Sequence, residues 1–398
     1  LGLFCIANAL KPESRIPPAY FTIPLVVDVA WALLSSFSLS GAARKLRMAK
    51  VAVVLCVILF IFTAPRYSGV VIGILIGIFL MLDASLRGVG AWVIHFDGWR
   101  RSLVFAVVEF CFGLWSLVPW PTHWEGAVGV DVGTLLVLSA TGVCGLARRI
   151  RTLPRDMPIL TAMSRGWGNA TRLYGRGASA AMSAAGEGGT VIVHVWTPTS
   201  GLVPINRAIS RYIAAPDGKG VISSGHAALE LGEDVYISHY PAAEIDRTVS
   251  EFTSILRATS DNDVDGLFQS SYSQESADWC PSTMQVRLPG LNVQAVREFW
   301  AAYRTDATYN LTNRNCSSVV VKALDIGLDG LFEKEMSVVF FVRFILTSEF
   351  RIAGFIRHRA AATAWTPGLV LDYARALSHI LAMEKETLLR EDWEGDAG

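Results

Sequence analysis

The sequence predicts a protein in two parts, an α-helical transmembrane bundle over residues 1–150 and a cytosolic α+β domain over residues 190–335. Hydrophobic residues make up 52% of the 398 residues and charged residues only 18%, against about 25% charged in typical soluble domains. The long uncharged runs gather in the first part, whereas the second part has the composition of a globular domain. Strand-like segments followed by a helix in the second part predict an antiparallel sheet packed on that helix.

Five apolar runs in the first part are expected to cross a membrane, because a helix of about 20 residues spans the bilayer core. They are residues 20–43, 50–65, 68–95, 101–119 and 127–147. The opening segment Leu1 to Leu10 is apolar but too short to cross. It lacks the basic flank and cleavage-type ending of a signal peptide, so we expect it to be the end of a sixth, truncated helix.

The loops between these runs alternate in their content of Lys and Arg, which predicts the orientation of the helices. Basic residues concentrate at 44–50, at Arg100 and Arg101, and at 148–155, whereas the alternate loops hold few. The basic loops are expected in the cytosol, and the last of them directly precedes the second part. We therefore expect a multi-pass protein of a bacterial inner membrane, in contact with membrane lipids and with its C-terminal domain in the cytosol.

Small residues at helical spacing, such as Gly73 and Gly77, let helices approach closely. Together with helix pairs that end in proline, this pattern resembles the six-helix HdeD-like membrane proteins linked to acid resistance, over about 150 residues. The resemblance implies a helical membrane assembly, and it leaves open a homo-oligomer formed through the transmembrane helices.

Four carboxylates, Asp28, Asp83, Glu109 and Asp131, lie inside or at the edges of the apolar runs, where an ionised group is costly and often functional. One interpretation is a role in proton or ion movement, as in a transporter. The other, which we favour, is that they are paired. Arg87 lies one helical turn after Asp83, and the other three carboxylates can form contacts between helices or lie near the interface.

Composition also limits the class of partner and cofactor. The formal net charge is zero, which argues against a nucleic-acid partner because such a partner needs a concentrated basic surface. Four of the six cysteines lie in the apolar part, so we expect free thiols and no disulfide framework. No ligand clusters have zinc-like spacing, so we expect no metal and no other cofactor.

The second part begins with residues 190–197, whose β-branched and aromatic residues predict a strand. Two further strand-like runs, Ala227–Leu231 and Val235–Tyr240, flank a tight turn and predict a hairpin. Another short strand is expected at Met284–Leu288. An amphipathic helix follows over residues 293–303.

Less regular segments flank these elements. Residues 151–189 are rich in Gly, Ala, Ser and Arg, which is typical of a linker. The polar stretch Thr259–Ser282 is expected to form either a lid over a cleft or a disordered loop. Residues 336–398 are expected to form amphipathic helices. In the first, Val338–Ile356, charged residues argue against a membrane span and favour packing on the membrane or on the anchor; the second covers about Gly368–Leu389.

Cys316 lies at the start of an apolar helix, after a run of Asn and Thr. The unpaired amides and the dipole of a helix N-terminus lower the pKa of a thiol, and an imidazole within reach completes its activation. We expect His226, at the start of the hairpin, to be the base, and His239, on the second strand, to orient it. The Cys316 amide, with Tyr309 or Asn315, is expected to stabilise an oxyanion.

The order His, His, Cys on strand, strand and helix resembles the circularly permuted papain-like thiol enzymes. That superfamily includes the lecithin:retinol acyltransferase-like and PPPDE-type proteins, relatives of the NlpC-type peptidases. The matching pieces are Gly225-His226, the second histidine at His239 and Asn315-Cys316, within residues 190–327. The resemblance implies an acyl-enzyme on Cys316. Ser317 and Ser318 stand where the acyltransferase branch has acidic and aromatic residues, so the substrate stays open.

The sequence thus predicts a membrane-anchored, cysteine-dependent hydrolase or acyltransferase that acts on an amide (peptide) or a lipid acyl group at the cytosolic membrane face. The alternative is a non-catalytic stress-response membrane assembly in which the papain-like domain only binds. Cys280 lies in a polar loop without helix context and is a weak rival for the nucleophile. His194, on the first strand, is expected to be structural.

Overall fold

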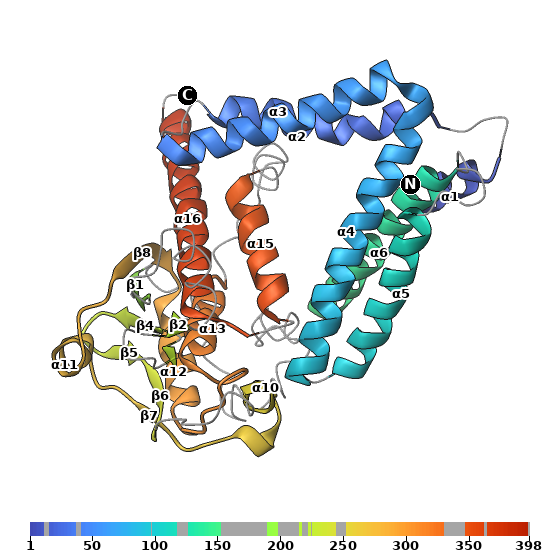
Figure 1. The fold of residues 1–398 in the computed structure, drawn as a ribbon. Coiled ribbons are helices and arrows are strands. Elements are labelled where there is room, and N and C mark those ends of the chain that lie inside the picture. The colour runs from blue at the N-terminus through green and yellow to red at the C-terminus, as the bar shows by residue number, and fades with distance from the viewer. Residues whose placement is uncertain are drawn as a thin grey trace. The chain divides into compact units, whose positions relative to one another are not determined.

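The computed structural model divides the chain into two units (Figure 1), Leu1–Val89 with Arg101–Arg149 and Gly90–Arg100 with Ile150–Gly398. The residues that it describes are 1–11, 16–36, 41–96, 98–117, 126–152, 189–197, 215–216, 222–223, 225–243, 252–329, 347–361 and 364–396. The expected linker at 151–189 lies almost entirely outside them.

The first unit is helical throughout its described residues. Its elements are α1 (Gly2–Ala9), the short 3-10 helix η2 (Pro18–Thr22), α2 (Ile23–Ser36), α3 (Gly41–Thr63), α4 (Pro65–Ile94, which continues into the second unit), α5 (Trp99–Leu117) and α6 (Ala127–Thr152). The described residues of all five expected runs therefore lie mainly in helices. The first run, 20–43, is not one continuous element, because α2 ends at Ser36 and α3 begins at Gly41.

Two described helical segments are long and apolar enough to cross a membrane. They are Tyr67–Ile94 in α4, with 28 residues, and Ala127–Arg149 in α6, with 23 residues. Large apolar side chains on α4, such as Phe79, Leu82 and Leu86, are 60% exposed or more. A surface of this kind is costly in water and matches the environment of lipid chains.

Glycines let these helices approach closely. A methyl group built on Gly77 of α4 would lie 2.7 Å from the Gly113 carbonyl oxygen of α5, and one built on Gly73 would lie 3.2 Å from the Ser116 carbonyl oxygen. Side chains do not reach a separation of 2.7 Å without moving the backbone. The small-residue face expected at Gly73 and Gly77 is thereby confirmed as the contact between α4 and α5.

The four carboxylates of the apolar runs all have polar partners, as the favoured interpretation expects. The contacts are Lys50 with Asp28 at 2.7 Å, Arg87 with Asp83 at 2.9 Å, Arg87 with Glu109 at 3.2 Å, and Ser116 with Asp131 at 2.8 Å. Arg87 therefore links α4 to α5, and the Ser116 hydroxyl links α5 to α6. Pairing offsets the cost of placing charge among apolar helices.

The second unit contains a four-stranded antiparallel sheet in the order β5-β4-β1-β8. Its strands are β1 (Gly189–Trp196), β4 (His226–Leu231), β5 (Val235–Ile237) and β8 (Met284–Leu291), and two smaller pairs join β2 (Ala215–Pro216) to β3 (Ile222–Ser223) and β6 (His239–Pro241) to β7 (Gly266–Phe268). The hairpin is present as β4 and β5, but its second strand ends at Ile237, and His239 and Tyr240 lie on β6, which pairs with β7. The two other expected strands are confirmed, and β2, β3 and β7 are additional.

Helices cover one face of the sheet (Figure 1). The helices of this unit are α10 (Phe252–Ile255), α11 (Tyr272–Asp278), α12 (Val293–Tyr303), α13 (Cys316–Gly327), α15 (Ser348–Ala361) and α16 (Pro367–Asp396). Alternate strand residues such as Val193 and Leu229 are fully buried in one cluster with Val320 of α13 and Ala374 of α16. Burial of this apolar face holds the Cys316 helix against β4.

The other face of the sheet is covered by the segment around α11. Trp196 of β1 and Tyr236 of β5 form a smaller buried cluster, against which Tyr272 and Cys280 pack. The stretch Thr259–Ser282 is not a disordered loop, because it contains the short 3-10 helix η4 (Ser260–Asn262), β7 and α11. These elements are too short to give a clear hydrophobic period in the sequence.

The two C-terminal helices are present, with shifted bounds. Residues 330–346 lie outside the described part, and α15 buries Ala353, Ile356 and Ala360 in the core of its own unit. Phe355 on its opposite side is 61% exposed. The helix expected at Gly368–Leu389 is confirmed as α16, which is longer at its C-terminal end.

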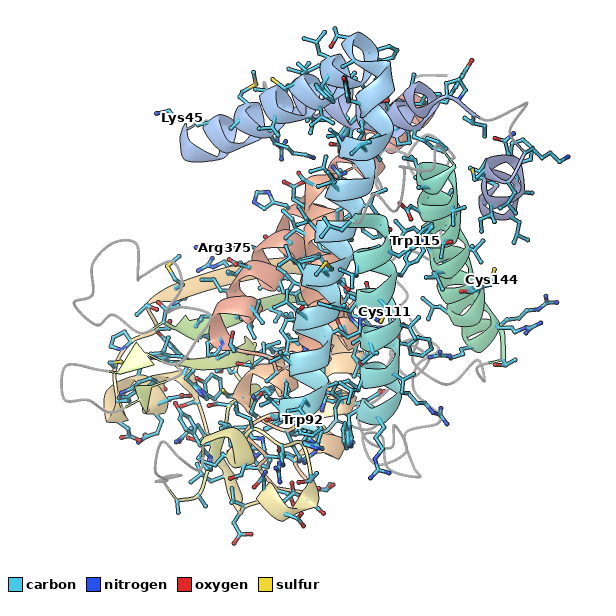
Figure 2. The ribbon with its side chains drawn as sticks, turned by 45° about the vertical axis from the view of Figure 1, so that its right-hand side comes forward. Lys45, Trp92, Cys111, Trp115, Cys144 and Arg375 are labelled. Carbon is cyan, nitrogen blue, oxygen red and sulfur yellow. The ribbon has the colours of Figure 1, made fainter. Side chains whose placement is uncertain are left out.

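All six cysteines are free thiols, as expected. Cys111 on α5 and Cys144 on α6 are exposed (Figure 2), whereas Cys316 is buried. Only Cys280 and Cys316 belong to the second unit, so they are the thiols available to chemistry there.

The contact between α4 and α5 predicts the effect of adding one methyl group. Gly77→Ala should destabilise the helical unit by about 1–3 kcal/mol, because the methyl group would overlap the Gly113 carbonyl and overpacking has costs of this size. Gly142→Ala is the matched control, since nothing lies within 4 Å of its added carbon. Thermal unfolding in detergent should show a lower Tm for the first variant alone, and equal Tm values would contradict the close contact.

Candidate active site

Cys316 is the first residue of α13, and Asn315 begins that helix. The Asn315 side chain accepts the Ser318 N–H at 2.7 Å, and the Ser318 hydroxyl accepts the Asn315 N–H at 2.9 Å. This reciprocal capping box satisfies two donors that a helix start would otherwise leave unpaired. The expected placement of the thiol at a helix N-terminus is confirmed.

The Cys316 thiol lies against the backbone of β4. The Ala227 amide lies close enough to the sulfur to lower the pKa of the thiol, and Ala227 directly follows His226. Burial raises the pKa of the Cys316 thiol, and the donors from Ala227 and Ser317 offset only part of that rise. The lowered pKa expected from the helix N-terminus is therefore outweighed by desolvation, and the resting group is a neutral thiol.

His226 is 2% exposed, and its Nε2 atom meets two oxygens. The Ser238 hydroxyl lies at 2.9 Å and the Glu275 Oε1 atom at 3.2 Å. A carboxylate accepts the Nε2 proton, which leaves Nδ1 as the basic nitrogen. Burial, helped by the nearby His239, lowers the pKa of His226 to about 3, so its imidazole is neutral at physiological pH.

Glu275 of α11 is the site residue that the sequence analysis missed. It is 2% exposed, and its two oxygens accept hydrogen bonds from the Tyr236 and Tyr240 hydroxyls, each at 2.6 Å. The Tyr240 ring also stacks on the His226 imidazole, with centroids 4.0 Å apart. Burial and Glu275 raise the pKa of both tyrosines, so both phenols remain donors.

His239 does not contact His226 by a hydrogen bond, in contrast to the expected orienting role. Its Nδ1 accepts from the Tyr303 hydroxyl at 3.1 Å, and its Nε2 donates to the Ala307 carbonyl at 3.2 Å. Both nitrogens are thus engaged elsewhere. Burial lowers the pKa of His239 to about 4.

Strand alternation explains this difference. Successive side chains of a strand point to opposite faces, and Tyr236, Ser238 and Tyr240 all contact His226 or Glu275. His239 lies between two of them in sequence and therefore points to the opposite face, where α12 supplies the Tyr303 hydroxyl. Ser238 and Glu275 hold His226 in place of His239.

The two expected auxiliary residues have different surroundings. The Asn315 amide nitrogen donates to the Leu311 and Trp365 carbonyls, and its oxygen caps α13, so the side chain is fully engaged in structure. Tyr309 is buried, and its ring meets the His239 ring edge-on at 5.1 Å. Burial raises the pKa of Tyr309, with a contribution from Cys316, so Tyr309 belongs to the surroundings of the thiol.

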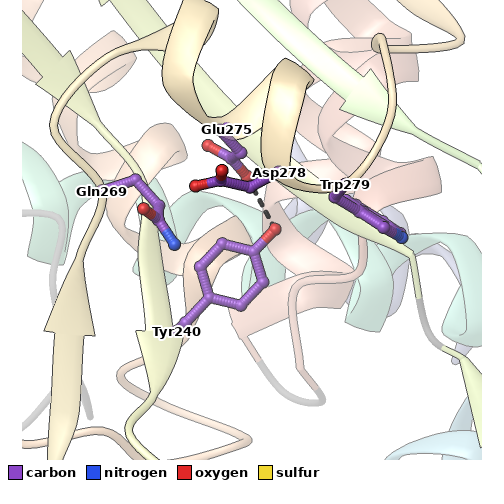
Figure 3. A pocket seen from close by; sticks show the side chains of 5 residues that line it. All are labelled: Tyr240, Gln269, Glu275, Asp278 and Trp279. Carbon is purple, nitrogen blue, oxygen red and sulfur yellow. Dashed lines mark hydrogen bonds between the residues drawn. The ribbon is translucent and has the colours of Figure 1, made fainter.

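A pocket of about 300 Å³ opens beside this constellation (Figure 3). The described residues that line it are Tyr240, Gln269, Glu275, Asp278 and Trp279. Two of these, Tyr240 and Glu275, also contact the His226 ring. The side chains of Tyr240 and Glu275 therefore separate the pocket from the His226 ring.

The remaining candidates have structural roles. His194 is 1% exposed and lies between Glu230 at 2.8 Å and Ser282 at 3.3 Å, as expected for a structural residue. The Cys280 carbonyl accepts the Trp196 indole N–H, which anchors the loop after α11. Within the described residues, no group of three or more His, Cys, Asp or Glu side chains is arranged to hold a metal ion.

Comparison of the chain with protein-family models, with curated proteins and with solved structures finds no match. Its function is therefore inferred from the geometry of the site.

The two buried imidazoles predict how stability depends on pH. Their pKa values in the folded chain, about 3 for His226 and about 4 for His239, lie below the unfolded value of about 6.5. The contribution of the two neutral rings to the free energy of unfolding should be fully present above pH 6.5. The free energy of unfolding should fall as the pH drops toward 4, by up to about 1.4 kcal/mol per pH unit for each histidine.

Chemical denaturation of the full chain in detergent at several pH values measures this loss. The pH dependence should be weaker in the His226→Gln variant, which removes one of the titrating groups. A second unit equally stable at pH 7 and pH 5 would contradict the neutral, buried state of the two rings.

Proposed function

We propose that the chain is a membrane-anchored, cysteine-dependent hydrolase or acyltransferase that acts through an acyl-enzyme on Cys316. The observation that carries this proposal is the position of the thiol. Cys316 begins a helix beside β4, where the Ala227 amide lowers the pKa of its thiol, and the Glu275 carboxylate lies 3.2 Å from Nε2 of His226, the residue before Ala227. A thiol, an imidazole and a carboxylate, the three groups from which such a triad is built, thus lie on neighbouring elements of the second unit.

In the proposed reaction, Nδ1 of His226 takes the thiol proton as the sulfur attacks the carbonyl carbon of an amide or ester. The carbon–nitrogen or carbon–oxygen bond breaks, and the imidazolium gives its proton to the departing amine or alcohol. Water, or another amine or alcohol, then attacks the thioester and passes a proton through His226 back to the sulfur. The enzyme acts as a hydrolase when water attacks the thioester, and as an acyltransferase when an amine or alcohol does.

Backbone donors at the thiol support the developing charge in this scheme. The Cys316 N–H is at the first position of α13, where a helix leaves its amides without an intrahelical acceptor. The Ala227 N–H already reaches the sulfur, so it lies within a short distance of a carbonyl oxygen bound there. We assign these two amides to the oxyanion in place of Asn315, whose side chain is engaged elsewhere.

The antiparallel sheet packed on the Cys316 helix, with His226 ahead of the cysteine in the chain, is what a permuted papain-like domain requires. We propose this fold for the second unit. The apolar helices and the basic loops support placement in a bacterial inner membrane with the catalytic unit on the cytosolic side. An amide (peptide) or a lipid acyl group at that surface is the proposed substrate.

Selective loss of one thiol tests the proposal. Cys316→Ala should abolish labelling of the second unit by an acylating, thiol-reactive probe and should abolish turnover, because no nucleophile remains, while membrane insertion is kept. Cys280→Ala is the matched control and should label like the parent protein. Mass spectrometry of the labelled peptide identifies the site. Labelling that persists in Cys316→Ala would refute the assignment, and a Cys316 that never labels would favour the non-catalytic assembly.

A second comparison tests which residue orients the base. Glu275→Gln should lower the rate of acyl-enzyme formation by about two to four orders of magnitude, because the carboxylate that favours the imidazolium is lost. A glutamine can still accept one tyrosine hydroxyl and donate to the other, so folding should persist.

His239→Gln provides the contrast. Its ring bonds Tyr303 and Ala307 instead of His226, so the variant should lose about 1–3 kcal/mol of stability while the folded fraction keeps its rate. Pre-steady-state kinetics, normalised to the folded fraction, separates these effects. A larger rate loss in His239→Gln than in Glu275→Gln would reverse the two roles.

A further inference from the structure

The pocket beside the site carries uncompensated negative charge. Asp278 accepts both of its side-chain hydrogen bonds from the neutral Gln274 amide, and Glu275 accepts from two phenols. Neither carboxylate pairs with a Lys or Arg within the described residues, and none of the described lining residues is basic. Because the adjacent His226 ring is neutral, no cation among the described lining residues cancels this charge.

Aromatic surface adjoins these carboxylates. Trp279 is 51% exposed, and one face of its indole stacks on Trp196 with ring centroids 5.7 Å apart. The Tyr240 ring forms another part of the lining (Figure 3). Aromatic faces attract cations through their quadrupole, and Gln269 adds an amide that can donate or accept a hydrogen bond.

The pocket lies next to His226, the base of the proposed reaction. The Tyr240 ring stacks on His226, and the Glu275 carboxylate bonds it, so a group in the pocket is held next to the base by side chains that also orient the base. A volume of about 300 Å³ accommodates an alkylammonium chain of the size of an amino-acid side chain. An anionic group would be repelled by two carboxylates.

We propose that this pocket binds an organic ammonium group of the substrate, so that the amide or ester attacked by Cys316 belongs to a cationic molecule. This inference rests on the proposed function. Asp278 supplies the charge that selects the ammonium group, Trp279 supplies its aromatic contact, and Gln269 hydrogen-bonds a neighbouring polar atom. The ammonium group comes either from a peptide amine or from a lipid headgroup.

Paired electrophilic probes test the selection on the full chain in detergent at low ionic strength. A peptidyl acyloxymethyl ketone with a lysine side chain is compared with its ε-acetylated, uncharged counterpart. The charged probe should modify Cys316 about tenfold faster, since a carboxylate at contact distance near a protein surface favours a cation by at least this factor. Asp278→Asn and Trp279→Leu should each reduce this preference.

Two controls separate binding from chemistry. Asp261→Asn removes an exposed carboxylate outside the lining and should keep the preference. Iodoacetamide, which carries no charge, should modify Cys316 equally in the parent protein and in Asp278→Asn. Phosphatidylethanolamine vesicles that slow the charged probe would assign the ammonium group to a lipid, whereas competition by lysine amide alone would assign it to a peptide.

Equal rates for the charged and acetylated probes in the parent protein would overturn the inference while leaving the proposed function intact. Failure of every reagent, including iodoacetamide, to modify Cys316 would instead overturn the proposed function. In that case calorimetric binding to Cys316→Ala still decides about the pocket. Lysine amide should bind more tightly than norleucine amide, and equal affinities would refute the ammonium site.

Discussion

A buried carboxylate, Glu275, is the constraint on which the site depends. Removing a carboxylate from water is costly unless strong donors replace its hydration, and here two tyrosine hydroxyls at 2.6 Å do so. Those phenols come from β5 and β6, while Glu275 itself lies on α11. The requirement to satisfy one charge therefore fixes α11 against β5 and β6, and it places the Glu275 carboxylate 3.2 Å from Nε2 of His226. The pocket lining and the base are positioned by a single polar network.

In the helical unit, too, carboxylates among apolar side chains have polar partners. Apolar side chains cover the exposed surface of α4, and each carboxylate among the apolar helices meets a cation or a hydroxyl from another helix or from the next turn. Arg87 bridges two acidic residues on α4 and α5, where glycines bring the backbones together. Close packing and charge pairing therefore occur at the same interface and stabilise one arrangement of the two helices.

Features that depend on neighbouring residues could be predicted from the sequence, whereas contacts between residues far apart in the sequence could not. The Gly232 turn between two apolar runs predicts the hairpin, and Asn315 before an apolar run predicts the start of α13, because both depend on neighbouring residues alone. The orienting partner depends on strand register, in which Ser238 and His239 differ by one position and so face opposite sides. Glu275 gave no signal, since its partners are far away in sequence. The break between α2 and α3 was hidden for a related reason, because an apolar run does not reveal where its helix ends.

Burial determines the resting state of the thiol and the imidazole in the reaction that we propose for Cys316. The thiol and the imidazole are both neutral at rest, since desolvation raises the pKa of Cys316 and lowers that of His226. In the proposed reaction, proton transfer between them would create two buried charges, which is unfavourable unless each charge is met by a preorganised partner. In that scheme Glu275 would face the imidazolium, and the Ala227 amide would face the sulfur or the oxyanion formed on the substrate. A cationic group of the proposed substrate would meet Asp278 and Glu275 in the adjacent pocket, and Glu275 also lies 3.2 Å from Nε2 of His226. In the proposed scheme, substrate charge and imidazolium would therefore share one carboxylate, and Asp278 would supply the additional negative charge.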